Sequence, residues 1–349
     1  MSSDPDADLK RAQQLLDLGR AAQAREVAAS VLAARPNSAG ALRLLARCHM
    51  ALGDHREAVR IARAAVAADP ASEHGYRILS TALRRIKNKR EAAAAAAEAV
   101  RLAPQEWRAH AALAQSLYRR SPKRALAAAE QARRLAPENP EPHYLCGVTL
   151  SALRYREGEA RAAYLRALEI DPQHTASLNG LALLDQRGWR FASAARGFRR
   201  ALGADPQHPT VQRNLEALLL LRLWCLGWLA VAGDVVVAAG RGGGAGPTRA
   251  LAVGCEAVLL ALFAASARSA KKGSGALGVR LLHRNRGALI CKAIIAASAV
   301  LIAIAAVVPQ VVENGAYTAV RVSLALLNVA VLLVLLSLRH RASASPDAL

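Results

Sequence analysis

Residues 143–172 read HYLCGVTLSALRYREGEARAAYLRALEIDP, a stretch whose small residues and final proline recur at regular places along the chain. The proline that closes it is one of six that each follow an Ala-rich segment. They are Pro36, Pro70, Pro104, Pro137, Pro172 and Pro206, separated by 34, 34, 33, 35 and 34 residues. Self-similarity at this spacing is typical of stacked repeats in which each unit packs on its neighbours.

Two columns of small residues keep the same period. The first holds Ala46, Ser80, Ala114, Gly147 and Ala182, and the second holds Ala24, Ala58, Ala92, Ala125, Ala160 and Ala194. In the second unit, Leu42, Leu45 and Ala46 share one helical face. A small residue on that face lets another helix approach closely, and a proline ends that helix because its ring removes a donor and clashes with the preceding turn. The pattern therefore predicts an all-α chain of antiparallel helix pairs.

These columns resemble the tetratricopeptide repeat, whose consensus is W-x2-L-G-x2-Y, then A-x3-F, then P. The quoted stretch supplies His143, Cys146, Gly147 and Leu150, then Ala160 and Tyr164, then Pro172. The resemblance covers six units within residues 1–208, of which the first is the most degenerate. It implies a solenoid of helical hairpins whose first helices line a groove that presents side chains to partner proteins.

Helical spacing places a set of polar and aromatic side chains on this groove. The candidate partner-binding residues are Arg43, Arg47, Arg77, Arg84, Arg108, Tyr118, Tyr144 and Asn179. Because guanidinium forks suit carboxylates, we expect a cytoplasmic protein or peptide, acidic in character, as the partner. The alternative is a solvated arginine face in a chain with a net charge of +21. Tetratricopeptide domains that clamp a C-terminal carboxylate use Asn with Lys, and the basic units here lack Asn in this groove.

After Pro209 the composition of the chain changes, and it becomes almost entirely apolar near residue 218. Residues 209–221 begin as one more amphipathic helix, and four apolar stretches follow at 219–239, 250–267, 288–312 and 319–338. Stretches of this length suit transmembrane helices of about 20 residues. The expected architecture is therefore a tetratricopeptide-type solenoid, a closing helix that runs into the membrane, a four-helix transmembrane domain over 219–338, and a tail at 339–349.

Charges between the apolar stretches set an expected topology. The segment 268–287 contains six Lys and Arg residues, whereas residues 313–318 contain none. Short cytoplasmic loops carry the Lys/Arg excess, so segment 268–287 and both termini are expected in the cytoplasm, with the basic loop near anionic lipid headgroups. The polar start of the sequence contains no signal peptide, which agrees with this orientation. We expect a multi-pass protein of a bacterial plasma membrane.

Arg222 and Lys292 lie near the inner boundary of the expected spans, whereas three other charged residues, Asp234, Glu256 and Arg321, fall in the outer part of the bilayer. Charges in a bilayer tend to pair with one another, which favours a structural lock between them. A proton or ion relay is the functional alternative. That alternative would make the chain a small transporter or channel subunit that the repeats regulate.

Other kinds of site find little support. The Gly-rich segment 240–246 follows an apolar stretch and lacks the surrounding βαβ unit that a dinucleotide site needs, so no cofactor is expected. The five cysteines are scattered without metal-ligand spacing, so no metal site is expected. Aromatic residues are too few to favour nucleic-acid binding. We expect a non-enzymatic, membrane-anchored interaction scaffold; the identity of the partner and the oligomeric state do not follow from the sequence.

Overall fold

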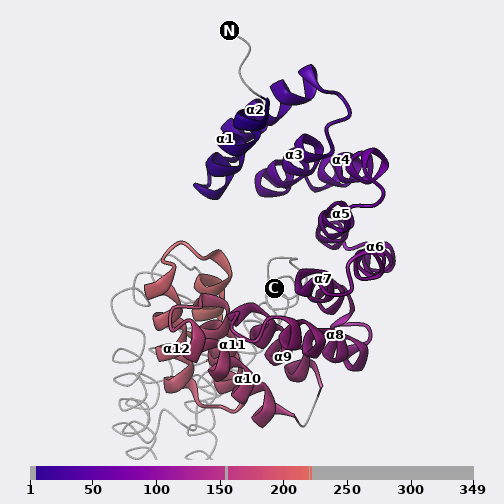
Figure 1. Cartoon of the computed structure of the whole chain (residues 1–349). Coiled ribbons are helices and arrows are strands. Elements are labelled where there is room, and N and C mark those ends of the chain that lie inside the picture. Colours follow the sequence, from indigo (N-terminus) through magenta and orange to yellow (C-terminus); the bar gives the residue numbers. More distant parts are fainter. Residues whose placement is uncertain (1–4, 154–155, 220, 222–349) are drawn as a thin grey trace, which may run out of the picture. The chain divides into compact units, whose positions relative to one another are not determined.

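The computed structural model describes residues 5–153, 156–219 and 221, and its ordered elements are all helices within those ranges. Residues 209–219 are also helical. The helices that carry labels in Figure 1 are α1 (Pro5–Asp17), α2 (Ala21–Ala34), α3 (Ala39–Leu52), α4 (His55–Ala68), α5 (Glu73–Arg85), α6 (Lys89–Leu102), α7 (Trp107–Leu117), α8 (Pro122–Leu135), α9 (Pro140–Ala152), α10 (Glu157–Ile170), α11 (Thr175–Arg187) and α12 (Phe191–Ala204).

Within the described residues, those up to Gly180 form one compact unit, and those from Leu181 to residue 221 belong to a second. Within the first unit, each odd-numbered helix packs on the even-numbered helix that follows it, from α1 with α2 to α9 with α10. Successive odd-numbered helices also pack on one another, and Figure 1 shows α3 to α8 as a row of such hairpins. This confirms the prediction of an all-α, repeat-type helical solenoid.

The two columns of small residues lie where the helices cross. All six alanines of the second column, from Ala24 to Ala194, are fully buried, and so are Ala46 and Ala114 of the first. A buried alanine keeps two helix backbones close and loses no side-chain entropy, which explains why this core needs few large side chains. Cys48 and Cys146 are buried free thiols in the same core, as expected for small apolar residues.

The recurrent prolines end the even-numbered helices as predicted. Each of these helices stops two residues before its proline, and the residue between them is extended, with ψ between 70° and 98°. Proline disfavours the helical conformation for the residue before it, which produces this common exit. In two units a histidine then closes the turn, because a ring nitrogen lies 2.8 Å from the proline carbonyl oxygen, in His110–Pro104 and His143–Pro137.

Four of the turns within hairpins share a left-handed residue at positions 19, 53, 87 and 189. In each, the backbone N–H of that residue donates to the carbonyl three residues earlier, and the next N–H donates to the carbonyl five residues before it. This is the Schellman arrangement, which usually has glycine at the left-handed position. Gly19 and Gly53 follow that rule, whereas Lys87 has φ of 63° and Trp189 has φ of 58°.

One aromatic ring fills the space between three helices of the first unit. Tyr164 of α10 is 3% exposed. A Cβ atom built on Gly147 of α9 would lie 2.5 Å from its Cε1, and one built on Gly180 of α11 would lie 2.6 Å from its Cζ. Glycine is therefore required at both positions because the ring occupies the volume of a side chain.

No helix within the described ranges is long and apolar enough to cross a membrane. The predicted spans at 219–239, 250–267, 288–312 and 319–338 lie outside the described residues, apart from the first residues of the earliest one. The predicted charge cluster of Asp234, Glu256 and Arg321 also lies outside them.

Candidate functional site: the inner face of the odd-numbered helices

We call the aligned polar side chains of α1, α3, α5, α7 and α9 the inner face. Hydrogen bonds between neighbouring odd-numbered helices establish that these side chains lie along one surface. Arg47 of α3 donates to Gln13 of α1, and Arg84 of α5 donates to Gln115 of α7. Arg43 of α3 reaches Ser72 at the start of α5, with 3.4 Å between Nη1 and Oγ.

The two arginines at the N-terminal end of the inner face each have an acidic neighbour. Arg43 Nη1 lies 3.6 Å from a carboxylate oxygen of Asp69, at the end of α4. Arg47 Nη2 lies 3.8 Å from a carboxylate oxygen of Asp17, at the end of α1. Because Asp69 and Asp17 are 43% and 63% exposed, solvent screens both pairs, and each contributes at most about 1 kcal/mol to stability.

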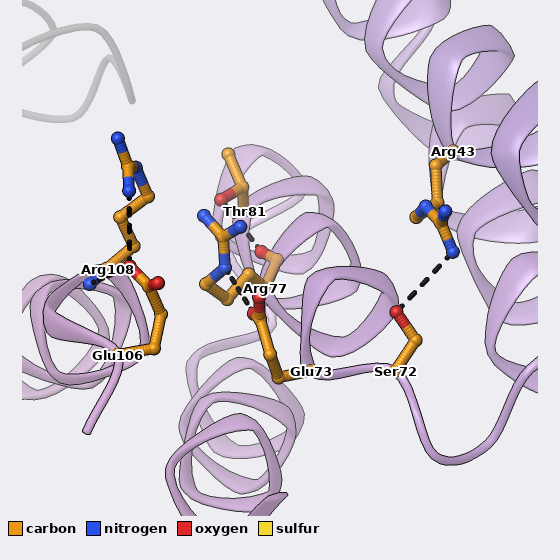
Figure 2. A network of polar contacts seen from close by, with 7 residues as sticks. All are labelled: Arg43, Ser72, Glu73, Arg77, Thr81, Glu106 and Arg108. Carbon is orange, nitrogen blue, oxygen red and sulfur yellow. Dashed lines mark hydrogen bonds and ion pairs between the residues drawn. The ribbon is translucent and has the colours of Figure 1, made fainter. Parts of the chain in front are cut away.

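Two further arginines are paired with acidic residues at the start of their own helices, as Figure 2 shows. Arg77 Nε lies 2.5 Å from Glu73 Oε2, and Thr81 donates to the Arg77 carbonyl one turn further along α5. Arg108 Nη1 lies 3.3 Å from Glu106 Oε1, and its guanidinium also lies 4.6 Å from the centroid of the Trp107 ring. These contacts hold the arginine side chains in defined positions.

Arg84 differs from these four arginines. Its only side-chain hydrogen bond in the described part of the chain is to Gln115, and no carboxylate there lies within ion-pair distance. Burial lowers the pKa of its guanidinium, and the charge of the adjacent Arg85 lowers it further. Tyr118, at the end of α7, and Tyr144 of α9 interact with it electrostatically. The structure thus brings together three residues predicted for the groove, Arg84, Tyr118 and Tyr144, from three consecutive odd-numbered helices.

His74 lies among the paired arginines. Burial lowers the pKa of His74 to about 4, and the charges of Arg77 and Arg43 lower it further, while Glu73 acts in the opposite direction. The imidazole is therefore neutral near pH 7 and can accept as well as donate a hydrogen bond. Its presence on this surface did not follow from the helical spacing used for the arginines.

The remaining predicted groove residues lie near α9 and α11. Tyr144 is buried, and its ring centroid lies 6.0 Å from that of Tyr164 and 5.6 Å from that of His174. Burial raises the pKa of the Tyr144 hydroxyl, so this phenol stays neutral. Asn179 of α11 is half-buried.

The acidic partners were missed by the sequence analysis. Only the Glu73–Arg77 pair has the spacing of four residues that identifies a helical ion pair directly. Asp17 and Asp69 stand at the ends of other helices, so their positions beside arginines depend on how the helices pack. Within the described residues, no group of three or more His, Cys, Asp or Glu side chains could hold a metal ion.

Comparisons with known proteins identify the repeat. A family model described as tetratricopeptide repeat matches residues 15–81. The crystal structure of the APC/C heterotetramer Cut9–Hcn1 is similar with a TM-score of 0.52 at 14% identity, covering 60% of this chain and 41% of that chain. This chain therefore spans less than half of that relative. No curated protein matched the sequence.

Two other solved structures show weaker similarity. Pseudomonas aeruginosa pilF has a TM-score of 0.46 at 22% identity, covering 58% of this chain and 92% of its own. YrrB, described as a TPR protein with an unusual peptide-binding site, has a TM-score of 0.37 at 17% identity, covering 53% of this chain and 95% of its own. We base the fold assignment on the family match and on Cut9–Hcn1. Residues 15–81 therefore match the tetratricopeptide repeat, and the helices that the structure describes share the fold of Cut9–Hcn1.

Proposed function

We propose that this protein is a membrane-anchored scaffold, without enzymatic activity, that binds partner proteins on the inner face of its repeats. Tetratricopeptide-repeat proteins generally mediate protein–protein interaction. The observation that supports this role most directly is the serial packing of the odd-numbered helices, linked by Arg47–Gln13 and Arg84–Gln115. A peptide laid across these helices would meet polar and aromatic side chains from several units at once.

The proposed partner is an acidic segment of a cytoplasmic protein. Five arginines on the inner face supply guanidinium groups that can bind carboxylates through two parallel hydrogen bonds. The carboxylates already beside four of them fix their orientation, and each guanidinium keeps further N–H groups for a ligand. The inner face would therefore distinguish peptides by the placement of their acidic residues.

The proposed anchor is the apolar region from residue 219 onward. Its four long apolar stretches and the basic segment 268–287 support insertion with both termini in the cytoplasm. Such an arrangement would hold the repeats at the membrane surface. The test is extraction of the full chain from membranes: it should stay with the lipid fraction in alkaline carbonate and be released by detergent. Release by carbonate alone would contradict the anchor.

The inner face is tested by photo-crosslinking of partners to the full chain in its native membrane. One variant reverses four inner-face charges, in R43E, R47E, R77E and R84E. The matched control reverses four arginines of even-numbered helices, in R63E, R101E, R134E and R166E. We expect the first variant alone to lose its crosslinked partners, with both variants as helical as the wild type. Equal loss in both would contradict a role for the inner face.

The alternative, a transporter or channel subunit, makes a different prediction. If the apolar region moves ions, the purified chain in proteoliposomes should carry a flux that Arg321→Leu abolishes. A flux that is unaffected by the four inner-face reversals, together with no loss of crosslinked partners, would favour the alternative over the scaffold.

A further inference from the structure

The inner face contains one positive charge that the described part of the chain does not neutralise. Arg43, Arg47, Arg77 and Arg108 lie 3.6, 3.8, 2.5 and 3.3 Å from carboxylate oxygens of Asp69, Asp17, Glu73 and Glu106. Arg84 instead donates to the amide oxygen of Gln115. An amide oxygen orients the guanidinium but carries no charge, so no carboxylate among the described residues compensates the positive charge of Arg84.

Because Arg84 is partly buried, its charge should interact more strongly with a ligand than an exposed charge would. Arg84 is half-buried, and desolvation is the main influence on its guanidinium. A desolvated charge without a partner is unfavourable, and an opposite charge placed beside it interacts more strongly than it would in water. Burial raises the pKa of the neighbouring Tyr144 phenol and keeps it neutral, and Arg85 adds a like charge. The surroundings therefore favour an incoming anion.

The place of Arg84 in the repeat array indicates how a ligand would reach it. Its neighbours come from α7 and α9, so the site lies where three odd-numbered helices follow one another. The inner face continues from this site toward α1 and α3. An extended peptide crossing these helices would therefore place an internal side chain, rather than its terminus, against Arg84. Tyr118 interacts electrostatically with Arg84, and its ring lies 5.5 Å from the Arg119 guanidinium; Arg and Tyr are typical of residues that dominate binding energy.

We propose that Arg84, oriented by Gln115 and flanked by Tyr118, binds one Asp or Glu side chain of an extended peptide and anchors that peptide on the inner face. This proposal rests on the proposed function and narrows it to one residue. The arginines that already have acidic neighbours contribute general attraction, whereas Arg84 sets the position at which the peptide must carry a carboxylate.

The test uses the full chain in detergent micelles and a library of random peptides displayed through their C-termini, so that no free C-terminal carboxylate is present. The wild type should enrich Asp or Glu at one fixed position. Arg84→Met keeps an unbranched apolar stem, removes the guanidinium group, and should lose that enrichment. The matched control, Arg101→Met, removes an exposed arginine of α6 that is paired with Glu98 outside the inner face, and it should retain the enrichment.

A selected peptide, synthesised as the amide, then provides an affinity measurement. Replacing its enriched Glu by Gln should weaken binding to the wild type by about tenfold or more, because a charge-assisted pair is lost. The same replacement should change binding to Arg84→Met by less than about twofold. Acidic enrichment that persists in Arg84→Met, or a wild type that selects peptides without any acidic position, would overturn the proposal.

A charge-reversal variant of Arg84 tests whether a lost preference is due merely to unfolding. Arg84→Glu should enrich Lys or Arg at the position where the wild type enriches Asp or Glu, a gain that an unfolded variant cannot give. Failure of Arg84→Glu to switch the preference would count against the assignment. If the wild type enriches no peptide at all, the proposed function fails and this inference fails with it, an outcome distinct from enrichment without an acidic position.

Discussion

The substitution Gly180→Ala tests the packing of the first unit most directly. A Cβ atom at this position would lie 2.6 Å from Tyr164 Cζ, 2.7 Å from Cε1 and 3.1 Å from Cε2. Carbon atoms normally approach to about 3.5–4.0 Å, so the ring or the helix must move. The ring cannot move toward α9, because the backbone of Gly147 lies against it there.

The expected loss of stability combines two opposing contributions. Overpacking by one methyl group costs about 1–3 kcal/mol. Alanine in place of glycine within a helix returns up to about 1 kcal/mol. We therefore expect Gly180→Ala to lower the free energy of unfolding by about 1–2 kcal/mol. The matched control is Gly158→Ala on α10, where the added Cβ would meet no atom within 4 Å. That variant should be as stable as the wild type or slightly more so.

A second substitution separates steric conflict from other causes. Leucine at position 164 lacks the three ring atoms that a Cβ on residue 180 would meet, so Gly180→Ala should become neutral or stabilising in a Tyr164→Leu background. The assay is chemical unfolding of the full chain in detergent, with hydrogen exchange of peptides from α9, α10 and α11 as the local readout. A penalty of equal size in both backgrounds would refute the steric explanation. So would a Gly180→Ala variant as stable as Gly158→Ala.

Three further predictions concern the turns and the inner face. Lys87→Gly should stabilise the chain by about 1 kcal/mol in thermal unfolding, because glycine adopts the left-handed conformation without steric cost. His143→Leu should destabilise it by about 1–2 kcal/mol in chemical unfolding, because the Pro137 carbonyl loses its side-chain partner. For His74, the folded-state pKa of about 4 lies below the unfolded value of 6.5, so stability present above pH 6.5 is lost as pH falls toward 4. Unfolding at a series of pH values should show this slope, and His74→Gln should reduce it.

The predictions for Lys87→Gly and His143→Leu each have a matched control. Arg90→Gly, in the first turn of α6, should be neutral or destabilising, in contrast to Lys87→Gly. His110→Leu should cost less than His143→Leu, because His110 is more exposed than the buried His143. Equal effects within either pair, or a pH slope unchanged by His74→Gln, would contradict the corresponding explanation.

The hairpins were predictable because equivalent positions in every unit carry small residues that are buried where two helices cross. Ala58 and Ala92 occupy equivalent positions 34 residues apart, and both are fully buried at helix crossings. A proline excludes helix at the residue before it, so the ends of the even-numbered helices followed from the sequence to within two residues. Each signal is weak in a single unit, but its recurrence at the same position in every unit predicted the fold.

The ion pairs of the inner face were not predictable in the same way. Helical spacing gives the direction in which Arg43 points, but its partner Asp69 stands at the end of the following helix, α4, and approaches only when α3 and α4 pack. The left-handed turn at Lys87 could not be predicted from the sequence for another reason. Its hydrogen bonds match those of Gly53, and only the register of the repeat, not the residue type, reveals the conformation.

The ion pairs of the inner face change what its arginines imply about partner binding. A row of unpaired arginines would attract any acidic surface, with an interaction that salt screens readily. With four of the five already beside carboxylates, the charge available to a ligand is concentrated at Arg84, where burial reduces screening by solvent and Gln115 fixes the direction of the guanidinium. The inner face would then recognise a peptide by the position of one carboxylate more than by its total charge. Specificity of this kind requires that the other arginines be neutralised, which gives Asp17, Asp69, Glu73 and Glu106 a role in recognition without contact to the ligand.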